Sequence, residues 1–430
     1  MRQPYFTMLN KYADTRMHVY PTEMSTQSLG RLKLRVTNRQ LQPIPGASIT
    51  ITQASVPNAV FDQLTTDASG LTNEVELPAP SLDYSQEPST QQPYSEFTLN
   101  INTTGYVPVT IQNAEIFPNV TAIQEASLVA TNPEGAELFV IPPHTLFGDY
   151  PPKIAESEIK QPSESGAIVL DKVVIPEYVV VHDGPPTDTS AANYYIRFRD
   201  YIKNVASSEI YATWPESTIT ANVLAILSFT LNRVYTEWYR NQGFNFTITS
   251  STAFDHKFIP GRNIYDNIGL IVDQLFTSYL SRPNVKQPIL TQYCDGNKSQ
   301  CPNWMTQWGS KDLGAQGKSA IEILRNFYGN SIFINSATEV SGVPSSWPGT
   351  NLTIGSSGAN VRMIQEQLNR ISDTYSVIPK VAVNGQFNQQ TADSVKAFQQ
   401  SFDLPASGIV DLPTWYKISS IYVAVARLSE

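Results

Sequence analysis

Apolar and polar residues alternate along the first third of the chain, a pattern typical of β-strands. Residues 31–36 (RLKLRV) alternate charged and apolar side chains, and residues 47–52 (ASITIT) follow a turn that contains Pro and Gly. The segments TTDASGLTNEVEL and SEFTLNINTTGYVPVTIQNAEIF repeat the order strand, turn, strand. We therefore expect an antiparallel β-sandwich-like domain over residues 30–141, preceded by a short segment over residues 1–29.

The middle of the chain has helical spacing of its apolar residues instead. The first predicted helix includes Tyr201. A second, whose apolar residues repeat more regularly, runs from Ile219 to Val234. The segments NIGLIVDQLFTSYL and GKSAIEILRNFYG predict two more amphipathic helices, the latter ended by Gly329. Residues 171–335 are thus expected to form a mainly helical domain.

Two segments without periodic apolar positions separate these regions. Residues 142–170 are rich in Pro, Ser and Gly, which indicates an exposed linker that proteases can reach. Residues 336–351 are expected to form a second linker, followed by more helical patterns over residues 352–420. The predicted fold class is therefore multidomain α+β.

The amino-acid composition limits the kinds of molecule that the chain is expected to bind. The chain has 430 residues, of which 41% are hydrophobic, and its formal net charge is −9, so we expect no nucleic-acid partner and favour a neutral, carbohydrate-like substrate. It lacks a run of about 18 apolar residues, so no membrane span is expected. Its first 20 residues contain no apolar core typical of a secretory signal, so none is predicted.

The segment NVASSEIYATWPES contains two glutamates with different expected roles. Thr213 and Glu216, with Pro215 between them, match the capping-box pattern at the start of the second helix, which gives Glu216 a structural role. Glu209 has no such role. The helix dipole would disfavour its charge by roughly 0.3–1 kcal/mol near the end of the first helix.

Burial of Glu209 against Ile210, Tyr211 and Trp214 would raise its pKa further, which suits a general acid. The structural alternative is a solvated glutamate at a helix end.

The C-terminal residues resemble the three-helix peptidoglycan-binding domain. The family pattern combines a Gly-x-x-Gly turn, a Leu-Gln helix, an NGxF segment, a Thr-x-x-Ala-Val-x-x-Phe-Gln-like helix and a closing Thr-Trp. The matching residues are Gly355, Gly358, Val361, Gln367, Leu368, Asn384, Gly385, Phe387, Thr391, Val395, Phe398, Gln399, Gly408, Thr414 and Trp415. This resemblance implies attachment to the cell wall.

Two segments of the middle region resemble the SpoIID-type lytic transglycosylases. They are DYIKNVASSEIYATWPESTIT and MTQWGSKDLGAQGKSAIEILRNFYG. The resemblance implies that Glu209 is the catalytic acid and base in cleavage between N-acetylmuramic acid and N-acetylglucosamine, with a 1,6-anhydro product. Leu227 departs from the family, which has Arg at the matching position.

Substrate-binding candidates follow from the same resemblance. Gln307 matches the motif glutamine, His256 matches a family segment in part, and Tyr293 and Trp308 would stack on sugars. Core packing is the alternative for the two aromatic residues, and a buried, hydrogen-bonded imidazole is the alternative for His256.

The order of regions resembles the SleC family of clostridial spore cortex-lytic enzymes. That resemblance implies an inactive precursor, located in the cortex and coat region of the dormant spore, outside the core. Its expected partners are cortex peptidoglycan and an activating germination protease. Two alternatives stay open: an N-acetylmuramoyl-L-alanine amidase, alone or as a second activity, and a non-catalytic wall-binding protein.

Few other residues could take part in metal binding or catalysis. Cys294 and Cys301 could form a disulfide, remain free thiols or, with His256, bind zinc; a structural loop is favoured and no cofactor or metal is expected. A second carboxylate from Asp255 or Asp266 would point to hydrolysis instead.

Overall fold

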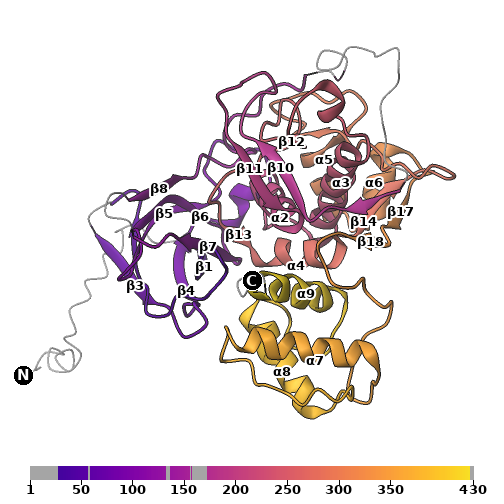
Figure 1. Cartoon of the computed structure of the whole chain (residues 1–430). Helices are drawn as coiled ribbons and strands as arrows, with labels where there is room; N and C mark the ends of the chain where they lie inside the picture. Colours follow the sequence, from indigo (N-terminus) through magenta and orange to yellow (C-terminus); the bar gives the residue numbers. More distant parts are fainter. Residues whose placement is uncertain (1–27, 57–58, 132–135, 155, 157–171, 427–430) are drawn as a thin grey trace, which may run out of the picture.

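The computed structural model describes residues 28–56, 59–131, 136–154, 156 and 172–426. Within these residues the chain has a mixed α+β fold, in which two N-terminal sheets, a central region around several helices and a C-terminal helical region follow one another (Figure 1). Residues 1–27 of the expected N-terminal segment lie outside the described part. No helix in the described part has the length and apolar character needed to cross a membrane.

Two β-sheets occupy the N-terminal region. The alternation seen in the sequence buries one side of the first strand, in which Leu32, Leu34 and Val36 are completely buried. One sheet has the strand order β13-β7-β1-β4 and the other β3-β2-β5-β6-β8. The strands of this region are β1 (Ser28–Asn38), β2 (Ser48–Gln53), β3 (Val60–Thr65), β4 (Val75–Ala79), β5 (Ser95–Asn102), β6 (Val109–Ile116), β7 (Thr121–Leu128) and β8 (Glu137–Val140).

These sheets are mixed, whereas the sequence suggested antiparallel ones. Strand β1 pairs with β7 in parallel, and so does β6 with β8, while the other pairs within the region are antiparallel. Alternation of apolar residues specifies which face of a strand is buried but not the direction of its neighbour. The antiparallel expectation was therefore wrong for these two pairs.

The central region is built around the long helix α3 (Glu216–Tyr235), which is buried along most of its length. The helices α2, α4, α5 and α6 pack against it, as does strand β14 (Ser278–Ser281). The predicted helices are confirmed, including the end of α6 at Gly329, except that the last three residues of the segment 267–280 belong to strand β14 instead of the helix. The other helices are α2 (Phe198–Glu209), α4 (Asp266–Leu275), α5 (Gln307–Ala315) and α6 (Ala320–Tyr328).

Short strands surround these helices. Strand β10 lies between β11 and β12, and β18, from the expected second linker, pairs with β9. The strands are β9 (Val174–Ile175), β10 (Tyr178–His182), β11 (Asn193–Arg197), β12 (Ile248–Thr249), β13 (Ile264–Tyr265), β14 (Ser278–Ser281), β15 (Tyr293–Cys294), β16 (Met305–Thr306), β17 (Phe333–Ser336) and β18 (Glu339–Val340).

Three helices form the C-terminal region: α7 (Ala359–Ser372), α8 (Gln389–Ser401) and α9 (Leu412–Ala426). Their apolar sides meet around Trp415, which is completely buried. Gly385 has a positive φ and lies against the backbone of Gly358, so a side chain there would be both strained and crowded. This region lies below the central one, with α9 next to α4 (Figure 1).

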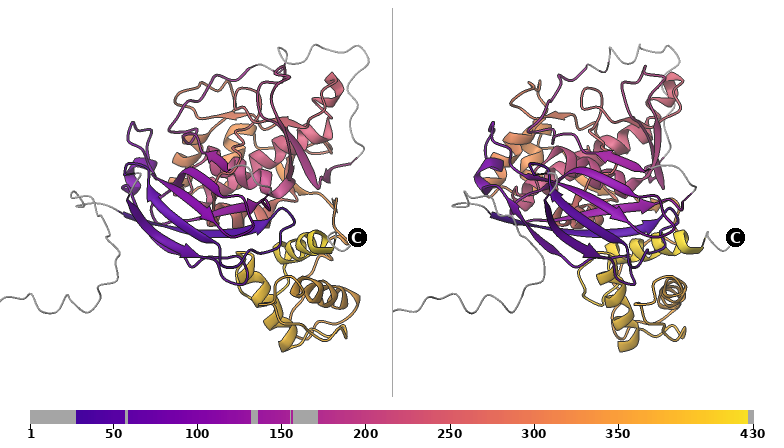
Figure 2. Two further views of the ribbon diagram at one scale, coloured as in Figure 1. Left: turned by 60° about the vertical axis from the view of Figure 1, so that its left-hand side comes forward. Right: turned by 90° about the vertical axis from the view of Figure 1, so that its left-hand side faces the viewer.

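The N-terminal sheets and the central region share a sheet. Strand β13 extends the first N-terminal sheet by pairing with β7, and Figure 2 shows the sheets lying against the central helices. At this boundary the Arg262 guanidinium forms a buried ion pair with the Glu115 carboxylate. The boundary is therefore an extensive packed interface and not a flexible connection.

The start of α3 differs from the one expected from the sequence. No capping box forms at the start of α3: Pro215 is the N-cap, and the Thr213 hydroxyl donates instead to Ser85 Oγ at 2.7 Å. The capping box occurs at α6, between Ser319 and Glu322. Tertiary contact with the N-terminal region thus overrides a local signal.

The first part of the expected linker is only partly exposed. Residues 142–154 run along the central region, and the side chains of Leu146 and Tyr150 are about 5% exposed. Its composition is that of a loop, but those two side chains are apolar or aromatic and find partners in the folded chain. The other part, residues 157–170, lies outside the described residues.

Candidate active site around Glu209

Glu209 is the last residue of α2, and its side chain is completely buried. The helix places it there because Tyr201, Ile202 and Val205 face the core on the same side. The next residue, Ile210, has an extended backbone, so the chain turns away directly after the carboxylate. The sequence therefore positions Glu209 rigidly, at the end of a packed helix.

Two N–H groups reach the Glu209 carboxylate. The backbone N–H of Lys257 donates to Oε1 at 2.5 Å, and Gln307 Nε2 lies 3.4 Å from Oε2. Gln307 Nε2 also donates to the Glu209 backbone oxygen at 3.1 Å. The Tyr293 hydroxyl faces the carboxylate without reaching hydrogen-bonding geometry in the described part of the chain.

Burial raises the pKa of Glu209 above its ordinary value. The positive charge of Lys153, the Tyr293 hydroxyl and the Lys257 N–H all act in the opposite direction, and burial outweighs them. A raised pKa favours the protonated carboxyl, which can give up its proton when its surroundings change. The electrostatics therefore suit a group that is first an acid and then a base.

Three of the four substrate-binding candidates gather near this carboxyl. Gln307 begins α5 and bonds to Glu209, whereas Tyr293 and His256 stack on each other with ring centroids 5.7 Å apart. His256 Nδ1 lies 3.1 Å from the Tyr201 hydroxyl, and burial lowers the pKa of the imidazole well below its ordinary value. His256 is thus a neutral, hydrogen-bonded ring in this structure, as its alternative assignment proposed.

Trp308 lies elsewhere. Its ring packs edge to face against Trp214, with centroids 5.1 Å apart, and contacts Tyr211 in the same way. Trp308 is about 7% exposed, so it forms part of the core in this structure. The core-packing alternative describes Trp308 better than sugar stacking does.

The two candidates for a second carboxylate are engaged in other contacts. Asp255 accepts hydrogen bonds from Arg233, Tyr239 and Thr249, at 2.6–2.9 Å. Asp266 lies at the start of α4, where burial raises its pKa and the Thr121 N–H acts against that rise. Asp266 therefore faces the N-terminal sheet, and Asp255 anchors a buried arginine.

Cys294 and Cys301 form a disulfide bond. The bond removes both thiolates, so the alternative of zinc held by these cysteines and His256 does not fit the side chains. The described residues contain no group of three or more His, Cys, Asp or Glu side chains arranged to hold a metal ion.

Sequence reasoning missed two neighbours of Glu209, namely Tyr150 and Lys153. The Lys153 Nζ donates to the Asp255 backbone oxygen at 2.8 Å and lies 5.3 Å from the centroid of the Tyr293 ring. Both residues belong to the segment 142–154. Nothing in its composition could have indicated this, because Pro, Gly and Ser predict only the lack of regular structure.

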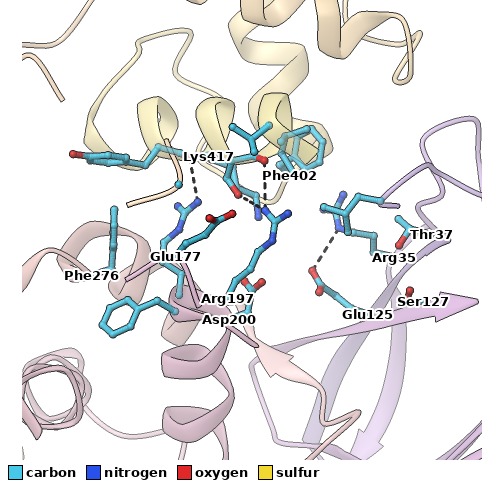
Figure 3. A pocket seen from close by; sticks show the side chains of 18 of the residues that line it. Arg35, Thr37, Glu125, Ser127, Glu177, Arg197, Asp200, Phe276, Phe402 and Lys417 are labelled. Carbon is cyan, nitrogen blue, oxygen red and sulfur yellow. Dashed lines mark hydrogen bonds and ion pairs between the residues drawn. The ribbon is translucent and has the colours of Figure 1, made fainter. Parts of the chain in front are cut away.

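A cavity of about 370 Å³ lies away from Glu209, where the three regions of the chain meet (Figure 3). Arg35 and Glu125 line it from the N-terminal sheet, Arg197 from β11 and Lys417 from α9. Its charges are mixed: Arg35 pairs with Glu125 within the N-terminal region, and the Arg197 guanidinium donates to the Ser420 hydroxyl of α9 at 2.7 Å. It is therefore a gap between packed regions and not the site suggested by the sequence.

Comparison with known proteins supports one part of this organisation. The family described as "Putative peptidoglycan binding domain" matches residues 357–418, which contain α7, α8 and the first half of α9. The C-terminal region is a peptidoglycan-binding domain. This supports association of the chain with peptidoglycan and the cell wall.

The other comparisons add no functional relative. No curated protein matches the chain. A chlorocatechol 1,2-dioxygenase from Pseudomonas putida is similar over 27% of this chain and 58% of its own length, with 13% identity and a TM-score of 0.16. At that score the likeness carries no argument about fold or activity.

Proposed function

We propose that the chain is a peptidoglycan lytic transglycosylase, in which Glu209 is both the catalytic acid and the catalytic base. The observation that carries this proposal is the Glu209 carboxyl itself: it is buried, its pKa is raised, and two N–H groups fix its orientation. It belongs to the same chain as a peptidoglycan-binding domain, which would hold the enzyme on its polymeric substrate. The segment resemblance to the SpoIID-type enzymes supplies the reaction class.

The proposed reaction needs one carboxyl group and no water nucleophile. Protonated Glu209 donates its proton to the oxygen of the glycosidic bond between N-acetylmuramic acid and N-acetylglucosamine, and the bond to the muramyl C1 breaks. The muramyl C6 hydroxyl attacks C1, and the Glu209 carboxylate accepts the hydroxyl proton. The products are a 1,6-anhydro-muramyl end and a free N-acetylglucosamine end, and Glu209 is protonated again.

We further propose that the chain is a spore cortex-lytic enzyme of the SleC type, made as an inactive precursor and located in the cortex and coat region of the dormant spore. A germination protease would cut it within residues 142–170. The order of regions supports this, with an N-terminal β region, a central region that contains Glu209 and a C-terminal wall-binding domain. Cortex peptidoglycan is then the substrate.

Replacement of Glu209 by Gln tests the proposed reaction. After proteolytic activation, the wild-type chain should produce anhydro-muramic ends from isolated cortex, and Glu209→Gln should lower this rate by roughly 10²–10⁴-fold. Mass spectrometry of the released fragments measures the product. The matched control is Glu216→Gln, because Glu216 is exposed at the start of α3.

The same experiment separates the alternatives. Free peptides without anhydro ends would assign an amidase, and an unchanged wall would assign a binding protein without catalysis. Full activity in Glu209→Gln, with folding and wall binding retained, would reject the proposed role of this residue.

A further inference from the structure

Glu209 is completely buried, yet a polymeric glycan must touch the carboxyl that acts on it. Some part of the chain therefore has to leave before substrate can bind. The neighbours of Glu209 that interact with its charge are Lys153, Tyr293, Lys257, Tyr150 and Tyr201. Among these five, Tyr150 and Lys153 lie outside the central region, in the segment 142–154.

This segment is attached on both sides of Glu209. On one side the Thr145 hydroxyl and N–H donate to the Ser208 backbone oxygen at 2.8 and 3.3 Å. On the other side the Ile154 N–H donates to the Ala253 oxygen at 2.8 Å. Ser208 directly precedes Glu209, and Ala253 lies four residues before Lys257, whose N–H bonds to the carboxylate, so the two anchors flank the site.

Two side chains of the segment, Tyr150 and Lys153, lie near the carboxyl. Tyr150 is buried, and its hydroxyl has no hydrogen-bond partner in the described part of the chain. Burial raises the pKa of Tyr150, and the charge of Glu209 adds to the rise. Lys153 lies over the Tyr293 ring, beside the same carboxyl.

The segment is also connected to the N-terminal β region. It follows β8 directly, and the His144 N–H donates to the Tyr94 hydroxyl at 3.1 Å. The His144 ring packs on Tyr211, two residues after Glu209, with centroids 4.8 Å apart. The segment, which is the first part of the region 142–170 where the cut is expected, thus spans from the β region to Glu209.

We infer that residues 142–154 form an autoinhibitory strap, which occupies the approach to Glu209 and must leave before a glycan strand can reach the carboxyl. The inference rests on the proposed function and adds to it which residues keep the precursor inactive. Cutting the chain beyond the strap would then activate the enzyme by allowing the strap to move.

The test uses the uncut, full-length chain with Tyr150→Ser and Lys153→Ser together. The strap variant should release anhydro-muramic ends from isolated cortex at least about tenfold faster than the uncut wild type, because smaller polar side chains weaken the cover. Lys318→Ser is the control, since Lys318 is exposed and distant in sequence from the strap. Thr145→Val, which removes one anchor bond, is a milder variant that keeps the aromatic packing.

Hydrogen exchange gives a readout that does not depend on catalysis. In the strap variant the amides of residues 253–258 should exchange at least about tenfold faster, while those of α3 keep their wild-type rates. Two results would overturn the inference of a strap. One is unchanged exchange at residues 253–258 in the strap variant. The other is no gain in activity of the uncut strap variant although the cut wild type is active. If exchange is faster but the cut wild type is inactive, the proposed enzymatic activity is rejected. The inference that residues 142–154 cover Glu209 then remains supported.

Discussion

At the scale of single residues, the carboxyl of Glu209 is held between opposing influences. Burial favours its neutral form, whereas the Lys257 and Gln307 N–H groups favour the charged form. The balance matters because the proposed reaction uses both forms in turn. Gln307 is the contact best suited to a test, since its side chain and not its backbone donates.

Replacing Gln307 by Met should move the alkaline limb of the pH–rate profile of the activated enzyme to higher pH. The reaction needs protonated Glu209, and loss of a donor to the carboxylate raises its pKa further. The variant should also lose about 1–3 kcal/mol of unfolding free energy, because the buried Glu209 backbone oxygen loses its side-chain donor. Initial rates on cortex from pH 4 to 9 provide the measurement.

Gln316→Met, an exposed change at the end of α5, is the control and should keep the wild-type profile. A lower rate with an unshifted alkaline limb would mean that Gln307 acts on the substrate and not on Glu209.

At the scale of helices and strands, the spacing of apolar residues predicted where the elements lie but not which elements pack or pair with one another. The apolar spacing of residues 219–234 gave helix α3, because a buried helix must repeat its apolar residues every three or four positions. By contrast, β13 contains two residues, Ile264 and Tyr265, and pairs with a strand about 140 positions away. A contact of that kind leaves no local pattern, so the join between β13 and β7 could not be predicted.

This join contains the buried pair of Glu115 and Arg262, whose removal should destabilise the chain. Burial raises the pKa of Glu115 to about 7 in spite of the guanidinium. Arg262→Met should therefore lower the unfolding free energy by about 3–5 kcal/mol at pH 8, where an unpaired carboxylate would stay buried. The loss should be smaller at pH 5, because there Glu115 takes up a proton in the folded chain.

Urea denaturation at both pH values measures the effect. Adding Glu115→Gln to Arg262→Met should restore much of the loss, and Arg240→Met, at an exposed arginine, should change little. Equal losses at pH 5 and pH 8 would contradict the proposed role of the Glu115 charge.

At the scale of the whole molecule, the order of three regions was predictable but their contacts were not. The C-terminal domain touches the N-terminal sheet through Asp403, which pairs with Lys33 at 2.7 Å and with Arg35. The Tyr375 hydroxyl donates to the backbone oxygen of Leu41. Charged residues of this kind are expected at the surface of each region, so the sequence gives no sign that they meet.

These contacts would hold the wall-binding domain against the β region in the uncut chain, and Asp403→Lys should release it. A lysine there would face Lys33 and Arg35, so charge-assisted bonds worth about 1.5–3 kcal/mol each become repulsions. Small-angle X-ray scattering of the uncut chain should then give a larger radius of gyration, with unchanged helix content by circular dichroism. Asp393→Lys, an exposed change on α8, is the control. If Asp403→Lys leaves both the radius and binding to isolated cortex unchanged, other contacts hold the domain, and the Tyr375 hydroxyl is the next to remove by Tyr375→Phe.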